Sequence, residues 1–213
     1  NFFSVVMVFN SVIYPVFLAI VVTAYYFTPG RYKWICLLFA SIAFYLSFIP
    51  VFLLLLLFIV IINYFLGKRL GHLADRRTVF FYIIIFLNIL LLAFFKYFNN
   101  IFPDNQIHLY NVDFFYRTDP VNKMILPAGL SYIIFTAISY HIEIKRKTIL
   151  PEKHLGYFSL YLLFFPKITQ GPIERPQNLI PQLHGTHTLN NESIVEGLKL
   201  MLWGYFKKLV VAD

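Results

Sequence analysis

The chain has 213 residues, of which 59% are hydrophobic and 13% are charged, and its mean hydropathy is +0.69. A soluble domain has about 45–50% apolar and about 25% charged residues, so this composition excludes an ordinary soluble fold and indicates a polytopic membrane protein. The net charge of +8 lies mainly in short loops between apolar stretches, which argues against nucleic-acid binding. The one cysteine, Cys36, implies neither a disulfide nor a metal site.

Five apolar stretches of between 16 and 20 residues follow one another along the chain. A helix needs roughly 20 apolar residues to cross the hydrocarbon core of a bilayer. We therefore expect five crossings, the shorter ones accommodated by a thin bilayer or by helix ends that snorkel to the interface. The predicted spans are residues 11–28, 34–49, 51–66, 79–98 and 124–140.

The loops between these spans differ in charge. Loops 29–33, 67–78 and 143–154 are rich in lysine and arginine, whereas loop 99–123 carries three aspartates. Because basic loops stay on the cytoplasmic side, these three loops are expected in the cytoplasm, with the turn at Pro50 and loop 99–123 outside. The alternation holds for all five spans and places the N-terminus outside.

The two ends of the chain are unusual. It does not begin with methionine, and residues 194–213 read as an apolar helix that still continues at the last residue. We therefore expect a piece of a longer protein, organised as a single membrane domain over residues 1–213. Asn190, Asn191 or Ser193 is expected to cap the last helix. Its lysines indicate an amphipathic helix, the first part of which lies along the membrane surface.

Residues 163–183 read LFFPKITQGPIERPQNLIPQL and break the pattern of plain apolar spans. Three of their prolines fall within eleven residues, and each removes a backbone donor and blocks the preceding helical turn. Residues 155–166 are too few to cross and are typical of a half-helix or a shallow insertion. Irregular backbone survives in a bilayer only where protein or a water-filled cavity covers it. The prediction is an all-α membrane bundle with a broken, re-entrant segment that starts on the cytoplasmic side and lines a cavity.

Some polar residues outside this segment have two interpretations. Asn88, in the middle of a span, is expected to bond a neighbouring helix rather than a substrate. His141, at the end of a span, is expected to be an interfacial side chain rather than a catalytic base. His184 and His187 are spaced like a metal pair, but with no adjacent acid they are expected to be solvated loop histidines. Gly129 marks either a kinked helix start or a close approach of another element, and the sequence does not separate the two.

The chain resembles the membrane-bound O-acyltransferases, and within them the bacterial alginate O-acetylation type. The pieces that carry the resemblance occur in the same order and spacing as in that family, over essentially all 213 residues. They are MVFNS at 7–11, NYFLGKRL at 63–70, KYFN at 96–99, LPAGLSYIIFTAISYHIEIKR at 126–146, FFPKITQGPIERPQNLIPQL at 164–183 and GLKLMLWGYFKKLVVAD at 197–213.

The resemblance implies transfer of acetyl from acetyl-CoA towards hydroxyls of an exported, alginate-like polysaccharide. The setting would be the bacterial inner membrane, with periplasmic or membrane-anchored acetylation partners. No residue here matches the family's catalytic histidine, which is expected beyond Asp213, so this piece alone is expected to be inactive. No bound cofactor or metal is expected.

Combining the resemblance with the broken segment gives a set of candidates for the substrate tunnel on its CoA side. Of these, Lys167 and Arg175 are candidates to meet the phosphates of CoA. Glu174 and Arg175 are expected either at the interface or against a wet cavity. The full set is Pro166, Lys167, Gln170, Gly171, Pro172, Glu174 and Arg175.

Two other classes of protein remain as alternatives. Transporters and flippases also contain broken helices at their binding sites, and a purely structural membrane subunit is the third reading. The sequence that follows Asp213 would discriminate between them. An apolar helix with a lone histidine favours acyl transfer, whereas a second set of spans that mirrors the first favours transport.

Overall fold

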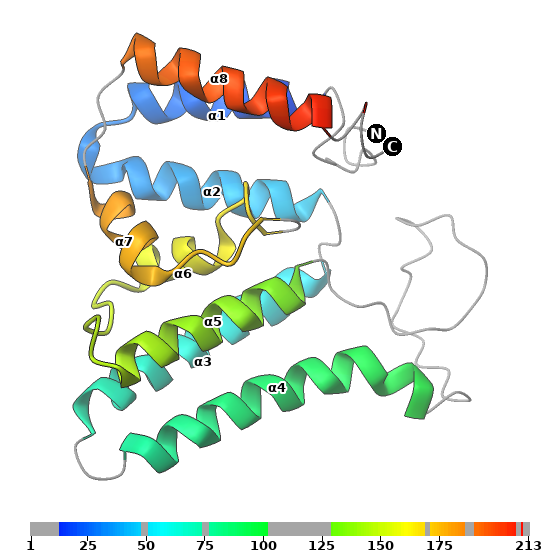
Figure 1. The fold of residues 1–213 in the computed structure, drawn as a ribbon, viewed down its shortest axis with the longest axis vertical. Coiled ribbons are helices and arrows are strands. Elements are labelled where there is room, and N and C mark those ends of the chain that lie inside the picture. Colours follow the sequence, from blue (N-terminus) through cyan, green and yellow to red (C-terminus); the bar gives the residue numbers. More distant parts are fainter. Residues whose placement is uncertain are drawn as a thin grey trace.

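The structure, a computed structural model, describes residues 13–47, 51–73, 77–101, 129–168, 171–185, 190–207 and 210. These residues form helices and connecting segments and contain no strand, which confirms the all-α bundle (Figure 1). In chain order the elements are α1 (Ile13–Phe27), the 3-10 helix η1 (Gly30–Tyr32), α2 (Lys33–Leu46), α3 (Val51–His72), α4 (Arg77–Ile101), α5 (Leu130–Lys145), α6 (Leu155–Leu163), α7 (Pro176–His184) and α8 (Asn191–Phe206).

The helices run roughly side by side, and their ends gather at two opposite ends of the bundle. At one end α1 passes into α2, α3 ends where α4 begins, and α5 passes into α6 (Figure 1). We call this the basic end, because all three of the loops predicted to be cytoplasmic belong to it. The alternation predicted from loop charge is therefore reproduced by the packing of the helices.

Helix lengths differ from the predicted spans. α3 and α4 each contain a stretch of 21 residues that is long and apolar enough to cross a membrane, Phe52–His72 and Arg77–Tyr97. α1, α2 and α5 have 15, 14 and 16 residues, so at 1.5 Å per residue they cover only about 21–24 Å of a hydrocarbon layer of about 30 Å. Among the described residues, only α3 and α4 are therefore long enough to cross a membrane. The helices α1, α2 and α5 are shorter than that layer is thick.

Two predicted helix ends were wrong. α3 continues six residues beyond the predicted end at residue 66, through Lys68 and Arg69. Lysine and arginine are good helix formers, and the Lys68 ammonium lies over the Tyr64 ring while Leu70 is fully buried. α5 runs on to Lys145 rather than ending at residue 140.

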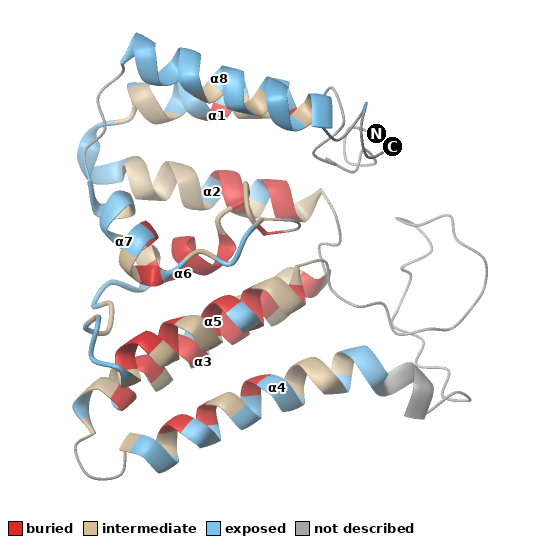
Figure 2. Cartoon of the chain, in the orientation of Figure 1, coloured by how far each residue is buried: buried red, intermediate tan, exposed pale blue. Residues whose placement is uncertain are grey.

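The core lies where α3, α5 and α6 meet, while α4 turns a broad apolar face outward (Figure 2). A large exposed apolar face of this kind marks a surface that meets lipid or another protein. With the composition, it supports a membrane-embedded bundle. The exposed large apolar residues of α4 are Val79, Tyr82, Ile83, Phe86, Leu87, Ile89, Leu90, Phe94 and Tyr97.

Three buried polar side chains join α3, α4 and α5. Asn63 Oδ1 accepts a hydrogen bond from Asn88 Nδ2 at 3.0 Å and lies 3.0 Å from His141 Nε2. The interhelical bond expected for Asn88 is thus confirmed. His141 is not interfacial but fully buried, because α5 continues for another turn beyond it. Since the Asn63 oxygen only accepts, the network assigns the imidazole proton to Nε2.

The last helix also differs in part from expectation. Asn190 caps it, as one of the predicted choices, and its side chain accepts from the Glu192 N–H at 3.0 Å. However, α8 lies alongside α1, along the length of the bundle, and does not lie across its end (Figure 1). Among its described residues none is buried, so α8 packs loosely on the rest of the chain.

Candidate functional site

The broken segment forms a hairpin that enters the bundle and returns. α6 begins at the basic end, where the His154 side chain caps it by accepting from the Gly156 N–H at 3.1 Å. The chain then leaves the helical path after Leu163, turns, and starts α7 with Pro176 at its first position, where a missing N–H costs nothing. α7 ends with His184 against Glu152, just before α6 begins (Figure 1). The predicted re-entrant segment is confirmed.

Glu152 closes the neck of this hairpin. One carboxylate oxygen lies 3.0 Å from His184 Nε2, the other accepts from the His154 N–H at 2.9 Å, and the Glu152 N–H donates to the Tyr140 hydroxyl at 2.8 Å. The Tyr157 ring lies 3.8 Å from the His184 ring, centroid to centroid. His184 is thus bonded and packed on one side, yet its side chain is 43% exposed. The expected contact with solvent is therefore confirmed, whereas the expected lack of an acidic partner was wrong.

The acidic partner of His184 lies 32 residues earlier in the chain, so no local pattern could have shown it. His187 lies outside the described residues. Within the described part of the chain, no group of three or more histidine, cysteine or acidic side chains is placed to hold a metal ion.

The hairpin reaches far from the basic end. A Cβ atom on Gly129, the residue that caps the start of α5, would lie only 2.4 Å from the Ile168 carbonyl oxygen. α5 is about 24 Å long, so the tip approaches the opposite end of the bundle. The prediction that the motif stretch starts on the cytoplasmic side was wrong, because α6 carries the chain inward first. Both interpretations of Gly129 are thus partly correct, since it caps the start of α5 and also lets the tip of the hairpin, at Ile168, approach closely.

Protein covers the turn of the hairpin. The Phe165 N–H donates to Ser41 Oγ on α2 at 3.2 Å, and the Phe165 ring packs edge-on against Phe17 of α1 at 5.3 Å. On the returning side the Tyr161 hydroxyl donates to the Glu174 carbonyl oxygen at 3.1 Å. Backbone groups freed from the helix thus gain partners inside the bundle, as irregular backbone at membrane depth requires.

Lys167 and Glu174 face each other across this turn. The Lys167 Nζ atom lies 4.0 Å from Glu174 Oε2, and the Lys167 side chain is only 12% exposed. Asn178 Nδ2 donates to the other Glu174 oxygen at 3.2 Å. Gly171 makes the turn possible, because a Cβ there would meet the Lys167 Cα at 2.6 Å. Lys167 is thus directed at Glu174 inside the hairpin, which weakens its case as a contact for CoA phosphates.

Residues 171–175 return from the tip as an extended strip, which we call the open strip. It has neither helical nor strand structure, and Pro172, Ile173 and Arg175 are exposed. Lipid cannot satisfy non-helical backbone, so this strip has to border water or other protein. Arg175 sits at its end and is the residue immediately before α7, next to Glu174, whose carbonyl contacts Tyr161 well inside α6. Gln170, the remaining predicted polar residue, lies outside the described residues.

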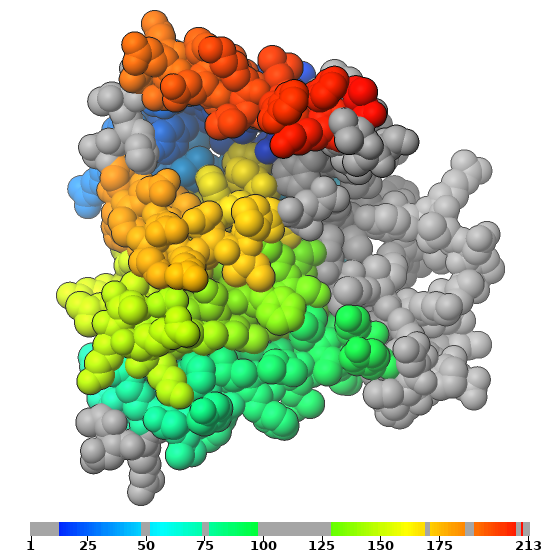
Figure 3. All heavy atoms as spheres, viewed as in Figure 1, coloured from blue at the N-terminus to red at the C-terminus, as the bar shows by residue number. Residues whose placement is uncertain are grey.

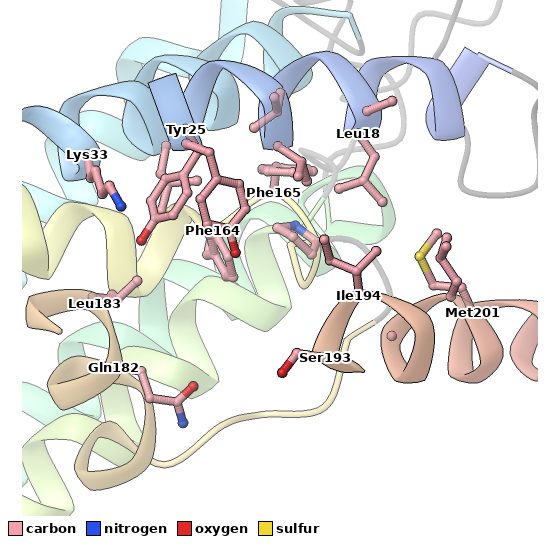
Figure 4. Close-up of a pocket in the computed structure, with 18 of the residues that line it drawn as sticks. Leu18, Tyr25, Lys33, Phe164, Phe165, Gln182, Leu183, Ser193, Ile194 and Met201 are labelled. Atoms are coloured by element: carbon pink, nitrogen blue, oxygen red, sulfur yellow. The ribbon is translucent and has the colours of Figure 1, made fainter. Parts of the chain in front are cut away.

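A cavity of about 590 Å³ lies on another side of the hairpin, between α1, α2, α7 and α8. The surface is hollowed between α8 and the hairpin (Figure 3), and Phe164 and Phe165 form the floor of the cavity (Figure 4). Pro166 also lines it. Of the predicted site residues that the structure describes, Pro166 lines this cavity and the others do not. Lys33, Gln182 and Ser193 line it as well, and sequence reasoning missed them because they come from three separate helices.

The amino-acid sequence is similar to known proteins along most of its length, and this similarity identifies the family of the chain. Over 212 residues, which are 97% of the chain, it is 31% identical to the probable alginate O-acetylases AlgI of Azotobacter vinelandii and of Pseudomonas aeruginosa. It is 26% identical, over 83% of the chain, to the peptidoglycan O-acetyltransferase of Helicobacter pylori. The chain belongs to the membrane-bound O-acyltransferase family. It spans 42%, 40% and 38% of the lengths of these three relatives. No family model and no solved structure matches it.

The hairpin presents a wall with an exposed cation, Arg175, at the start of α7 and an ion pair in the turn. A general base is a further requirement of acyl transfer to a hydroxyl. His141 is buried among α3, α4 and α5 and does not line the cavity. His154 and His184 take part in the neck of the hairpin. These three histidines thus take part in contacts within the bundle, and His72, the remaining described histidine, is exposed at the end of α3.

Proposed function

We propose that the complete protein containing this chain transfers acetyl from acetyl-CoA towards hydroxyls of an exported polysaccharide. The place would be the inner membrane of a bacterium. The observation that carries the proposal is the similarity to alginate O-acetylases along 97% of the chain. That these relatives are named O-acetylases and O-acetyltransferases favours acyl transfer over transport, the alternative that the broken helix also allows.

In this proposal the hairpin orients the acyl donor and a histidine elsewhere in the complete protein supplies the base. The histidine takes the proton from the acceptor hydroxyl while the oxygen of that hydroxyl attacks the thioester carbonyl carbon. The new ester C–O bond forms, the C–S bond breaks, and the CoA thiolate leaves with a proton. In this proposal the described residues of the hairpin, 164–168 and 171–175, help to hold both reactants in line.

The donor enters from the basic end and reaches Arg175, which is exposed at the start of α7. A guanidinium binds phosphate through paired, charge-assisted hydrogen bonds, so Arg175 is the stronger candidate for a CoA phosphate than Lys167. The acetyl group leaves on the opposite side, where periplasmic or membrane-anchored acetylation partners receive it. The neck residues Glu152 and His184 keep the two ends of the hairpin together during the reaction.

Membranes that contain the complete gene product should convert radiolabelled acetyl-CoA into base-labile acetyl esters. Replacing Arg175 by glutamine should raise the KM for acetyl-CoA about tenfold, the effect of losing one charge-assisted hydrogen bond. Arg146→Gln is the matched control, because that guanidinium is 65% exposed and pairs with Glu143 outside the hairpin.

Residues 1–213 expressed alone should transfer no acetyl group. Transfer by this piece would contradict the placing of the base outside it. An unchanged KM in Arg175→Gln would contradict the role of Arg175, and a complete protein that never consumes acetyl-CoA would overturn the proposal itself.

A further inference from the structure

We propose that the cavity beside α8 is a lipid site, which holds one acyl chain of an anionic phospholipid with its phosphate at the Lys33 end. The site is independent of acyl transfer and goes beyond the proposed function. The body of the cavity is apolar, with side chains from α1, α7 and α8 around the phenylalanine floor. Its apolar wall includes Leu18, Val22, Leu183, Ile194, Leu198 and Met201.

Three polar groups of the cavity gather towards one end, whereas Ser193 lies nearer the middle of the view (Figure 4). Lys33, Tyr25 and Gln182 lie on the same side of the view, while Leu18 and Met201 lie on the opposite side (Figure 4). The Lys33 ammonium sits over the Tyr25 ring at 4.7 Å and over the Tyr26 ring at 5.5 Å, which holds the cation in place. The cavity therefore has an apolar body and a fixed positive charge at one end.

The Lys33 end of the cavity lies on the side of the bundle where anionic lipid headgroups are expected to bind. Lys33 is the first residue of α2, at the basic end. Basic pockets between membrane helices on the cytoplasmic side bind anionic headgroups, and aromatic residues such as the two tyrosines sit at headgroup level. A volume of about 590 Å³ is in the range of sites that enclose a drug-sized ligand. Charge and shape together fit a phospholipid chain that runs inward from its phosphate.

The glycines of α8 offer a matched pair of variants. Gly197 lines the cavity, and a Cβ added there meets no atom within 4 Å. Gly204, on the same helix, is equally open but does not line the cavity. A tryptophan at residue 197 is therefore expected to extend into the cavity, whereas the same change at residue 204 leaves the cavity empty. Leucine at residue 197 is a smaller filler, should tryptophan disturb folding.

The test uses the complete protein in nanodiscs of phosphatidylcholine with a small share of phosphatidylglycerol that carries a photoactivatable group in its acyl chain. The probe should label peptides of α1 and α8. Gly197→Trp should abolish this labelling, and Lys33→Gln should reduce it about fivefold. Gly204→Trp and Lys68→Gln should leave it unchanged. Lys68 is a fair control because its ammonium also lies over a tyrosine ring, at 5.2 Å, outside the cavity.

Three results would overturn the proposal. Labelling that survives in Gly197→Trp and Gly197→Leu would show that the chain lies elsewhere. Equal labelling by a photoactivatable phosphatidylcholine would remove the role of the anionic headgroup. Loss of labelling on adding acetyl-CoA at the concentration that saturates turnover would assign the cavity to the acyl donor instead.

Discussion

Replacing Gly129 by alanine should destabilise the protein by about 3 kcal/mol. Gly129 has a φ of +76°, a backbone conformation that is strained for any residue with a side chain. Its Cβ would also lie 2.4 Å from the Ile168 carbonyl oxygen, which is a backbone atom and cannot rotate away. The tip of the hairpin then has to withdraw from the start of α5. Thermal unfolding in detergent, followed by circular dichroism, measures the loss.

The same substitution at Gly204 is the control for this experiment. A Cβ there meets nothing within 4 Å, and alanine favours a helix by about 1 kcal/mol over glycine, so Gly204→Ala should be neutral or slightly stabilising. A cysteine at Ile168, which is buried against Gly129, should also become more reactive in the Gly129→Ala background. Identical unfolding curves for the wild type and Gly129→Ala would contradict the close approach of the tip.

Replacing Asn63 by leucine should cost about 2 kcal/mol of stability. Asn63 Oδ1 is the shared acceptor of Asn88 and His141, so the change leaves His141 Nε2 without a partner in a fully buried position. His141 Nδ1 already has no partner among the residues described. Asn88 loses less, since its amide also bonds the Ile84 carbonyl of its own helix at 3.0 Å.

A double-mutant cycle separates this network from simple loss of packing. His141→Leu in the Asn63→Leu background should restore part of the stability, because no unpaired imidazole remains. Thr23→Val is the control, since that hydroxyl bonds only the Ala19 carbonyl of its own helix and should matter little. If the two leucine substitutions add without coupling, the three-helix network contributes no stability of its own.

The sequence was sufficient to predict the broken hairpin, and the reason is local. Proline restricts its own residue and the one before it, so Pro166, Pro172 and Pro176, spaced within eleven residues, do not allow one continuous helix. The cap at Asn190 was predictable on the same ground, because a side chain bonds the backbone two residues on. Loop charge gave the alternation of the helices, because it is a property of each loop alone.

The depth of the hairpin and the contacts at its neck could not be predicted in this way. Ile168 meets Gly129, and Glu152 meets His184, across 39 and 32 residues of sequence. Such contacts depend on how complete helices pack, and a sequence without relatives aligned to it contains no trace of them. The burial of His141 was missed for a simpler reason, since the predicted end of the fifth span lay five residues short of the end of α5.

The cavity between α1 and α8 could also not be predicted from the sequence. Its walls come from helices at opposite ends of the chain, and each helix taken alone is an ordinary apolar segment. Only the placing of α8 beside α1 reveals that Lys33 stands at one end of an apolar hollow. The prediction that α8 starts along the membrane surface, made from its lysines, would have hidden this feature.

Cysteine accessibility tests most directly the claim that the broken segment borders water rather than lipid. In a Cys36→Ser background of the complete protein in membranes, single cysteines would replace Ile173 and Arg175 of the open strip, with Leu87 and Leu90 of α4 as lipid-facing controls. A charged, membrane-impermeant thiol reagent should modify the two strip positions readily and leave the two α4 positions unmodified. If the strip positions are as protected as those on α4, the hairpin does not line a watery passage and this account of the chain is wrong.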